Sequence, residues 1–272
     1  MQASECWLDN QRFLVYQISC RSSDEHCRVG VEECPLRAPW SSRMTDTNLA
    51  IDVAAQLRRD ILRGKLLPGS AIKERDNASE LGVSRTPMRE AIRILAQDGL
   101  VVLRPSRSPI VARPSFKEIS DQVTVLLALE KLSAELACAN ALPEDLAEIR
   151  SIHDRIAAQY DYSDPLDLFE IDMEFHMAIV RAAKNRPLEE THRSYLARLW
   201  RARYLAASQK RNRDRVVRHH EAIISALEAK DIPALRAAID NHLGHLGEDI
   251  RPVIDEEERV LPSQTKVPEI AS

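Results

Sequence analysis

The chain has 272 residues, enough for two domains with separate hydrophobic cores, and its formal net charge of −4 is unevenly distributed. Residues 44–114 hold 12 Lys and Arg against 8 Asp and Glu, whereas residues 115–272 hold 21 against 28. This pattern favours local contact with phosphate through the first segment. We find no run of 18 apolar residues and no secretory leader, so we expect a cytoplasmic protein without a membrane span.

Residues 1–43 differ in composition from the rest of the chain and show no helical or strand period. Four of the five cysteines lie here. Cys20, Cys27 and Cys34 are candidate metal ligands, but their spacing of seven residues matches no zinc-finger pattern, so we expect no metal site among them. An odd number of cysteines argues against a disulfide framework. We therefore predict a disordered extension, with Met44 as the functional start of the protein.

A small DNA-binding module is predicted over residues 44–114. A helix over residues 50–63, ended by Gly64, precedes the turn at residues 65–69. A short second helix from Glu74 ends at Gly82, which can adopt the left-handed conformation of a sharp turn. Ser84 is then expected to cap a third helix through its hydroxyl group. The two short helices and the tight turn between them predict a helix-turn-helix.

The third helix of this module has one apolar face and one basic face. Met88, Ile92 and Leu95 repeat at i, i+4 and i+7 and predict burial, while the arginines at 85, 89 and 93 form a stripe elsewhere on the helix. An αα-hairpin with solvated arginines is the alternative. The segments at 100–103 and 110–112, joined by a basic turn, instead predict a two-stranded wing and favour the DNA-binding interpretation.

The stretch GVSRTPMREAIRILAQDGLV, preceded by Leu-Pro-Gly and Ile-Lys-Glu-Arg, resembles the winged helix-turn-helix of the GntR family of bacterial transcriptional regulators. The resemblance covers about residues 49–113. We expect Arg85 and Arg89 to carry most of the base recognition, because arginine reads guanine through two hydrogen bonds. The full set of expected DNA contacts is Arg75, Ser84, Arg85, Thr86, Arg89, Arg104 and Arg107. The tip of the wing lacks the glycine that is common in the family.

Residues 115–251 are predicted to form an all-helical bundle. Glycine is absent between Gly99 and Gly244, and prolines punctuate a sequence rich in Ala, Leu, Glu and Arg. Six helices are expected, at about 116–141, 144–160, 165–183, 187–208, 213–229 and 232–250, and Ser115 with Glu118 forms a capping box for the first. Residues 252–272 are expected to be a disordered tail. The predicted fold is thus mainly α, with a winged helix-turn-helix followed by an antiparallel helical bundle.

Three histidines and one aspartate fall on the apolar faces of three bundle helices. Asp172 and His176 lie four residues apart on one helix, and His220 and His242 lie in the apolar stripes of two later helices. Single buried histidines are usually hydrogen-bonded core residues. A buried carboxylate, however, is costly unless a positive charge lies beside it, and a divalent cation would serve Asp172 and all three imidazoles. His219 and His245 are expected to point elsewhere.

Residues 120–250 resemble the helical ligand-binding domain, called FCD, of the FadR subfamily of GntR regulators, in the six-helix form of its VanR-like members. The resemblance implies that Asp172, His176, His220 and His242 hold zinc, nickel or a similar ion, whose shell a small carboxylate effector completes. Family members often place an effector-binding arginine where this chain has Leu126. Either another cation replaces it, or the effector is less acidic. The candidate replacements are Arg150, Arg181, Arg201 and Arg203.

The sequence therefore predicts a homodimeric transcriptional regulator and not an enzyme. We expect a repressor that binds a pseudo-palindromic double-stranded operator and responds to an organic acid at the metal. One alternative is a metal-dependent, hydrolase-like helical domain fused to a DNA-binding module, because a metal with open positions can activate water. Another is a helical protein whose buried metal binds no small ligand.

Overall fold

The computed structural model describes residues 39–260, and their side chains from residue 48 onwards. Three cysteines at which no metal site is expected, Cys20, Cys27 and Cys34, lie outside the described residues, as does nearly all of the predicted extension. Helix α1 covers Pro39–Leu62, so it begins before Met44 and well before the expected residue 50. No helix in the described part is both long and apolar enough to cross a membrane.

The helix-turn-helix and wing are present as predicted. Helices α2 (Glu74–Glu80) and α3 (Arg85–Gln97) flank a turn in which Gly82 has a φ of +66°. Strands β1 (Val101–Arg104) and β2 (Arg107–Val111) pair antiparallel, and the turn between them places Ser106 at a φ of +55°. Ser84 is the N-cap residue of α3, but its side chain makes no capping hydrogen bond.

The core of this module is formed by the residues whose spacing predicted burial. Met88, Ile92 and Leu95 of α3 pack with Leu57 and Ile61 of α1, and all five are at most 2% exposed. The preceding loop contributes an unpredicted contact, because Ala71 forms a bridge with Ile110 of β2. α3 is therefore held on its apolar side, and its arginine side faces solvent.

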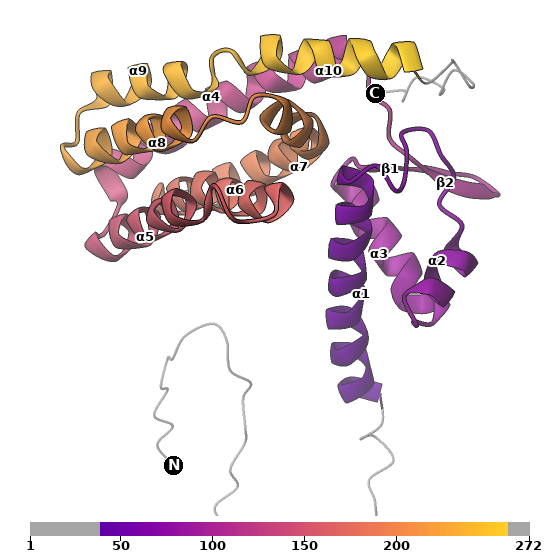
Figure 1. Ribbon diagram of the computed structural model, residues 1–272. Coiled ribbons are helices and arrows are strands. Elements are labelled where there is room, and N and C mark those ends of the chain that lie inside the picture. Colours follow the sequence, from indigo (N-terminus) through magenta and orange to yellow (C-terminus); the bar gives the residue numbers. More distant parts are fainter. Residues whose placement is uncertain (1–38, 261–272) are drawn as a thin grey trace, which may run out of the picture. The chain divides into compact units, whose positions relative to one another are not determined.

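The described part of the bundle contains seven helices rather than the six predicted (Figure 1). They are α4 (Phe116–Asn140), α5 (Pro143–Gln159), α6 (Pro165–Ala182), α7 (Arg186–Gln209), α8 (Arg213–Glu228), α9 (Ile232–Leu243) and α10 (Leu246–Val260). Their starts follow the sequence signals closely. The capping box of Ser115 and Glu118 is formed, and prolines occupy the first or second position of α5, α6, α7 and α9.

The end of the bundle differs from the expectation in two ways. The helix predicted over 232–250 is divided at Gly244, and residues 252–260 are helical instead of belonging to a disordered tail. Pro252 lies inside α10, where it removes one backbone hydrogen bond. Ile250, Val253 and Ile254 are nevertheless buried in the core with residues of α4 and α7, and this burial outweighs the cost of the proline.

The helices pack so that α6 lies at the centre of the candidate site. α6 contacts α4, α5 and α7, while α8 contacts α4, α5 and α9. One apolar cluster joins Phe175 and Ile179 of α6 to Ile223 of α8 and Ile239 of α9. The three helices that carry the predicted histidines therefore share one core.

Candidate metal centre and DNA-binding surface

Helix α6 positions the first two predicted ligands. Asp164 caps the helix by accepting a hydrogen bond from the backbone N–H of Leu166, and Pro165 occupies the first turn. The four-residue spacing then puts Asp172 and His176 on one face. His176 is 1% exposed, whereas the side chain of Asp172 is 21% exposed. The pair thus spans the boundary between the core and an accessible cavity.

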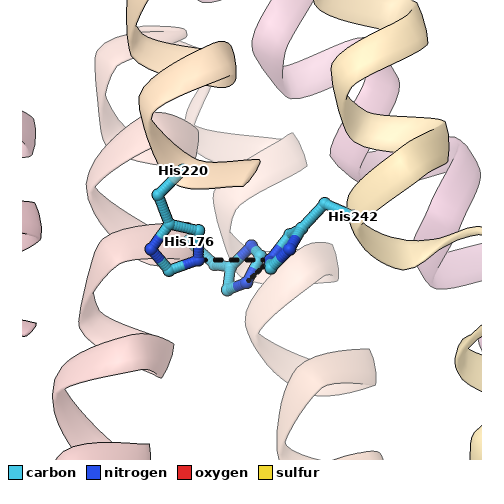
Figure 2. A group of neighbouring side chains, drawn as sticks. All are labelled: His176, His220 and His242. Atoms are coloured by element: carbon cyan, nitrogen blue, oxygen red, sulfur yellow. Dashed lines mark hydrogen bonds between the residues drawn. The ribbon is translucent and has the colours of Figure 1, made fainter. Parts of the chain in front are cut away.

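The imidazoles of His176, His220 and His242 point toward one another from α6, α8 and α9 (Figure 2). The Nε2 atom of His242 lies 3.2 Å from that of His220 and 3.3 Å from that of His176. All three ligand atoms lie within 4.8 Å of one another. Phe175 stacks on the His220 ring at 4.1 Å between centroids and fixes its plane.

This arrangement fits a divalent metal. Zinc–nitrogen bonds of about 2.0–2.1 Å place neighbouring ligand nitrogens roughly 2.9–3.3 Å apart at bond angles between octahedral and tetrahedral, close to the spacings of 3.2 and 3.3 Å around His242. A five- or six-coordinate ion held by these three histidines and Asp172 would keep a position open for a further ligand. Asp172 supplies a carboxylate oxygen 3.3 Å from His220 Nε2 but is not part of the compact group of three. Three nitrogens and one oxygen are a donor set that suits zinc or nickel.

The directions of the pKa shifts of His220, His242 and Asp172 also suit metal binding. Burial lowers the pKa of His220, although the hydrogen bond and charge of Asp172 oppose this. Burial likewise holds the pKa of His242 well below its usual value, and the neighbouring His220 and His176 lower it further. Burial alone would raise the pKa of Asp172, but the hydrogen bond with His220 and the nearby imidazoles keep this pKa low. Neutral imidazoles and an ionised carboxylate are the forms that bind metals.

A cavity of about 120 Å³ opens beside the histidines. Its polar wall includes Asp172, His242 and Arg203. Much of the remaining wall is apolar and comes from Ile156, Leu168, Phe169, Val216, Leu243 and Leu246. His219 also lines this cavity, with its ring edge-on to His242 at 5.8 Å, so it is closer to the site than its sequence position suggested. His245 is exposed and pairs with Glu248.

Among the four arginines considered for an effector, Arg203 alone lines this cavity. It is 4% exposed, and its buried Nη1 atom has no hydrogen-bond partner among the described residues. Burial lowers the pKa of Arg203, and the charges of Glu130 and Asp172 partly oppose this. The other three form ion pairs: Arg150 with Glu221 and Glu228, Arg181 with Glu148, and Arg201 with Glu257.

Three buried polar residues near the site were not identified from the sequence. One of them is His153 of α5, which is 4% exposed and lies edge-on to the His220 ring. Glu130 on α4 is 3% exposed and lies against His176, while His192 on α7 is fully buried beside Glu130. Glu130 could have been identified from the sequence, because it is a charged residue within the apolar stripe of α4. Leu126, at the position that the family resemblance associated with an effector-binding arginine, is 1% exposed and packs in the apolar core.

The exposed face of α3 presents the expected DNA contacts. Ser84, Arg85, Thr86 and Arg89 are all exposed. Arg89 donates a hydrogen bond to Glu74 of α2 at 3.0 Å, which orients its side chain. Arg85 forms no ion pair within residues 39–260, and it borders a shallow depression with Arg75 and Arg107. Arg104 instead donates to the backbone carbonyl of Ser108 and braces the wing.

Comparisons with known proteins match both halves of the chain. The model for bacterial regulatory proteins of the gntR family matches residues 49–111, and the model for the FCD domain matches residues 121–245. A transcriptional regulator of the HTH type from Streptomyces ambofaciens is 31% identical over 205 residues, covering 74% of this chain and 85% of that protein. The chain belongs to the GntR family.

Further relatives of this GntR-family chain are described as repressors. The RspR transcriptional repressor of Escherichia coli is 29% identical, over 74% of this chain and 88% of that protein. A protein of Paenarthrobacter nicotinovorans, described as a probable D-xylose utilization operon transcriptional repressor, is 30% identical over 75% and 89%. The family consists of DNA-binding transcriptional regulators and not of enzymes, as the sequence predicted.

Solved structures confirm the fold of this GntR-family chain. E. coli McbR/YncC superposes with a TM-score of 0.62 at 22% identity, over 77% of this chain and 98% of that one. A GntR protein from Rhodococcus sp. RHA1 superposes with a TM-score of 0.61 at 24% identity, over 76% and 99%. At these identities the likeness concerns the fold. The predicted combination of a winged helix-turn-helix and a helical bundle is therefore confirmed.

Proposed function

We propose that this protein is a transcriptional repressor whose operator binding is controlled by a small carboxylate docked at a metal site. The metal, zinc or nickel, is held by Asp172, His176, His220 and His242. The observation that carries the proposal is the buried, unpaired Nη1 of Arg203 in the wall of the cavity that His242 and Asp172 also line. Buried polar groups require partners, and a carboxylate on the metal would supply one.

The charges around the cavity favour an anionic ligand. A divalent ion would bring two positive charges, which the carboxylates of Asp172 and Glu130 would balance. Two further arginines line the cavity, Arg215 beside Asp249 and Arg211 over the Tyr160 ring. Arg203 itself leaves one positive charge in a largely buried site. A monoanionic carboxylate would neutralise that charge, because one of its oxygens could bind the metal while the other accepts from Arg203. The apolar wall formed by Leu168, Phe169 and neighbouring residues favours an effector with a short apolar body.

A binding experiment tests this function directly. Metal-loaded protein on operator DNA is titrated with a panel of carboxylic acids, including acetate, benzoate, malate and citrate, and with the corresponding amides. At least one acid is expected to weaken operator binding by 10-fold or more, while its amide does not. The same acid should have no effect after the metal has been removed by a chelator. An equal response with and without metal would contradict the proposal.

We further propose that the protein binds DNA as a homodimer. Two recognition helices related by a two-fold axis match the two halves of a pseudo-palindromic operator. The outer face of α4 has an exposed apolar stripe, with Val125 at 38% and Leu132 at 46%, which suits burial against a second copy. Two chains per operator are expected by mass measurement of the complex, and a stoichiometry of one would exclude the arrangement.

Substitution of Arg85 by alanine is expected to weaken operator binding by about 1–3 kcal/mol and to relax the base preference at one position. Arg85 is exposed at the first position of α3 and forms no ion pair within the described residues, although Glu74 and Asp76 border the same depression. Gel-shift titrations at fixed salt provide the measurement. Lys117→Ala is the matched control, because it also removes one exposed positive charge but lies on α4 of the bundle. Equal losses in the two variants would show a non-specific charge effect.

A further inference from the structure

Glu130 occupies an unusual position at the back of the histidine cluster. Its carboxylate lies 3.3 Å from Nδ1 of His176, the ring nitrogen on the opposite side from the one that faces His242. The side chain is 3% exposed, in a stretch of α4 otherwise buried through apolar residues such as Leu126 and Ala134. Burial of a carboxylate at this position is costly, and an apolar residue would pack there at lower cost.

The position of Glu130 beside Nδ1 of His176 affects which nitrogen of that ring carries the proton. A neutral imidazole carries one proton, on either Nδ1 or Nε2, and the nitrogen without the proton is the one that binds a metal. A carboxylate beside Nδ1 accepts a hydrogen bond from an Nδ1–H group and therefore favours that tautomer. The lone pair of His176 then lies on Nε2, directed toward His242 Nε2 at 3.3 Å.

His192 lies on the other side of the same carboxylate. Its Nε2 atom is 3.0 Å from Oε1 of Glu130, an ion-pair distance whose alignment does not meet that of a hydrogen bond. His192 is fully buried on α7, so it restricts how far the Glu130 carboxylate can rotate away from His176.

We propose that Glu130 is a positioning residue that holds the proton of His176 on Nδ1 and thereby presents Nε2 to the metal. Glu130 does not touch the metal or the carboxylate effector in this arrangement. Carboxylates hydrogen-bonded to metal-binding histidines typically raise metal affinity about 10–100-fold. The inference rests on the proposed function, because it assigns a role to Glu130 at the same metal site.

Metal affinity of two Glu130 variants tests the positioning role. Glu130→Leu removes the acceptor and is expected to weaken zinc binding about 10–100-fold in competition with a chelator. Glu130→Gln keeps an acceptor oxygen and should lose less than Glu130→Leu. Glu135→Gln, on the same helix but in a surface ion pair with Arg236, is the matched control and should bind zinc as the wild type does. Wild-type affinity in Glu130→Leu would overturn the proposal.

A second measurement does not depend on metal or on the variants. In metal-free wild-type protein with ¹⁵N-labelled histidine, NMR should find the His176 proton on Nδ1. A proton on Nε2 in the wild type would overturn the proposal even if Glu130→Leu were too unstable to purify. If Glu130 had only a structural role, His176 would show no preference between the Nδ1–H and Nε2–H tautomers.

The His176→Ala variant separates failure of this inference from failure of the proposed site. If His176→Ala loses zinc while Glu130→Leu binds it normally, the metal site stands and Glu130 has no positioning role. If His176→Ala also binds zinc with wild-type affinity, the metal site itself is misplaced and the role assigned to Glu130 falls with it.

Discussion

Substitution of His220 by alanine is expected to abolish stoichiometric metal binding. His220 is fully buried at the centre of the cluster, where its Nε2 lies 3.2 Å from that of His242 and 3.3 Å from Asp172. Its loss therefore removes one ligand and the contact that holds another. Metal analysis of the purified variant should show a depleted ion, and His176→Ala and His242→Ala should give the same result.

Metal binding is also expected to raise the Tm of the protein by a large amount. Metal at about 1,000 times its Kd stabilises the wild-type protein by about 4 kcal/mol, which raises the Tm of a bundle of this size by roughly 8–16 °C. His220→Ala should show no such metal-dependent rise. The comparison uses the shift on adding metal, because removing a buried ring that stacks on Phe175 lowers the metal-free Tm as well.

Two other histidines serve as controls for this prediction. His245 follows His242 by less than one helical turn, but its side chain is 74% exposed, so His245→Ala should keep the metal and its stabilisation. His219→Ala should also keep the metal but is expected to weaken the carboxylate response, because His219 lines the cavity. Loss of metal in His245→Ala with retention in His242→Ala would mean that the wrong histidine has been assigned.

The second large effect is expected at Arg203. Replacement by methionine removes the guanidinium that would pair with the effector carboxylate while preserving most of the side-chain volume. A hydrogen bond to a charged group contributes about 1.5–3 kcal/mol, so carboxylate affinity of the metal-loaded protein should fall roughly 10- to 150-fold. Isothermal titration of metal-loaded protein with the active acid gives the measurement. Metal content is expected to remain unchanged.

Arg150→Met provides the matched control for Arg203. Arg150 is one of the four arginines considered from the sequence, but it pairs with Glu221 and Glu228 and does not line the cavity. Its substitution should leave carboxylate affinity at the wild-type value. Equal carboxylate affinity in Arg203→Met and the wild type would contradict the anion-binding role of Arg203. A loss of affinity in Arg150→Met alone would show that the effector binds at a different site.

The DNA-binding module could be predicted from sequence because its signals are local. Gly82 adopts the left-handed conformation that a tight turn requires, and the spacing of Met88, Ile92 and Leu95 is the spacing of one helix face. The hydroxyl of Ser84 does not make its expected hydrogen bond, yet the residue still marks the start of α3. Proline and capping residues likewise located most of the bundle helices within a few residues.

Other features depended on contacts between residues distant in sequence. Residues 252–260 have a proline and an acidic composition, which favoured a disordered tail, but Val253 and Ile254 find an apolar surface on α4 and α7. No local sequence pattern predicts that contact, because it forms between segments that are distant in the sequence.

The sequence by itself determined the family, the two kinds of domain and the helix faces that carry Asp172, His176, His220 and His242. Helical periodicity assigns a side chain to a face, but it does not say which side chain from another helix will meet it. Only the tertiary structure brought the three imidazoles within 4.8 Å, placed Glu130 behind His176 and separated Arg203 from three ion-paired arginines. Those facts depend on how α4, α6, α7, α8 and α9 pack, because burial and charge pairing are properties of the assembled core.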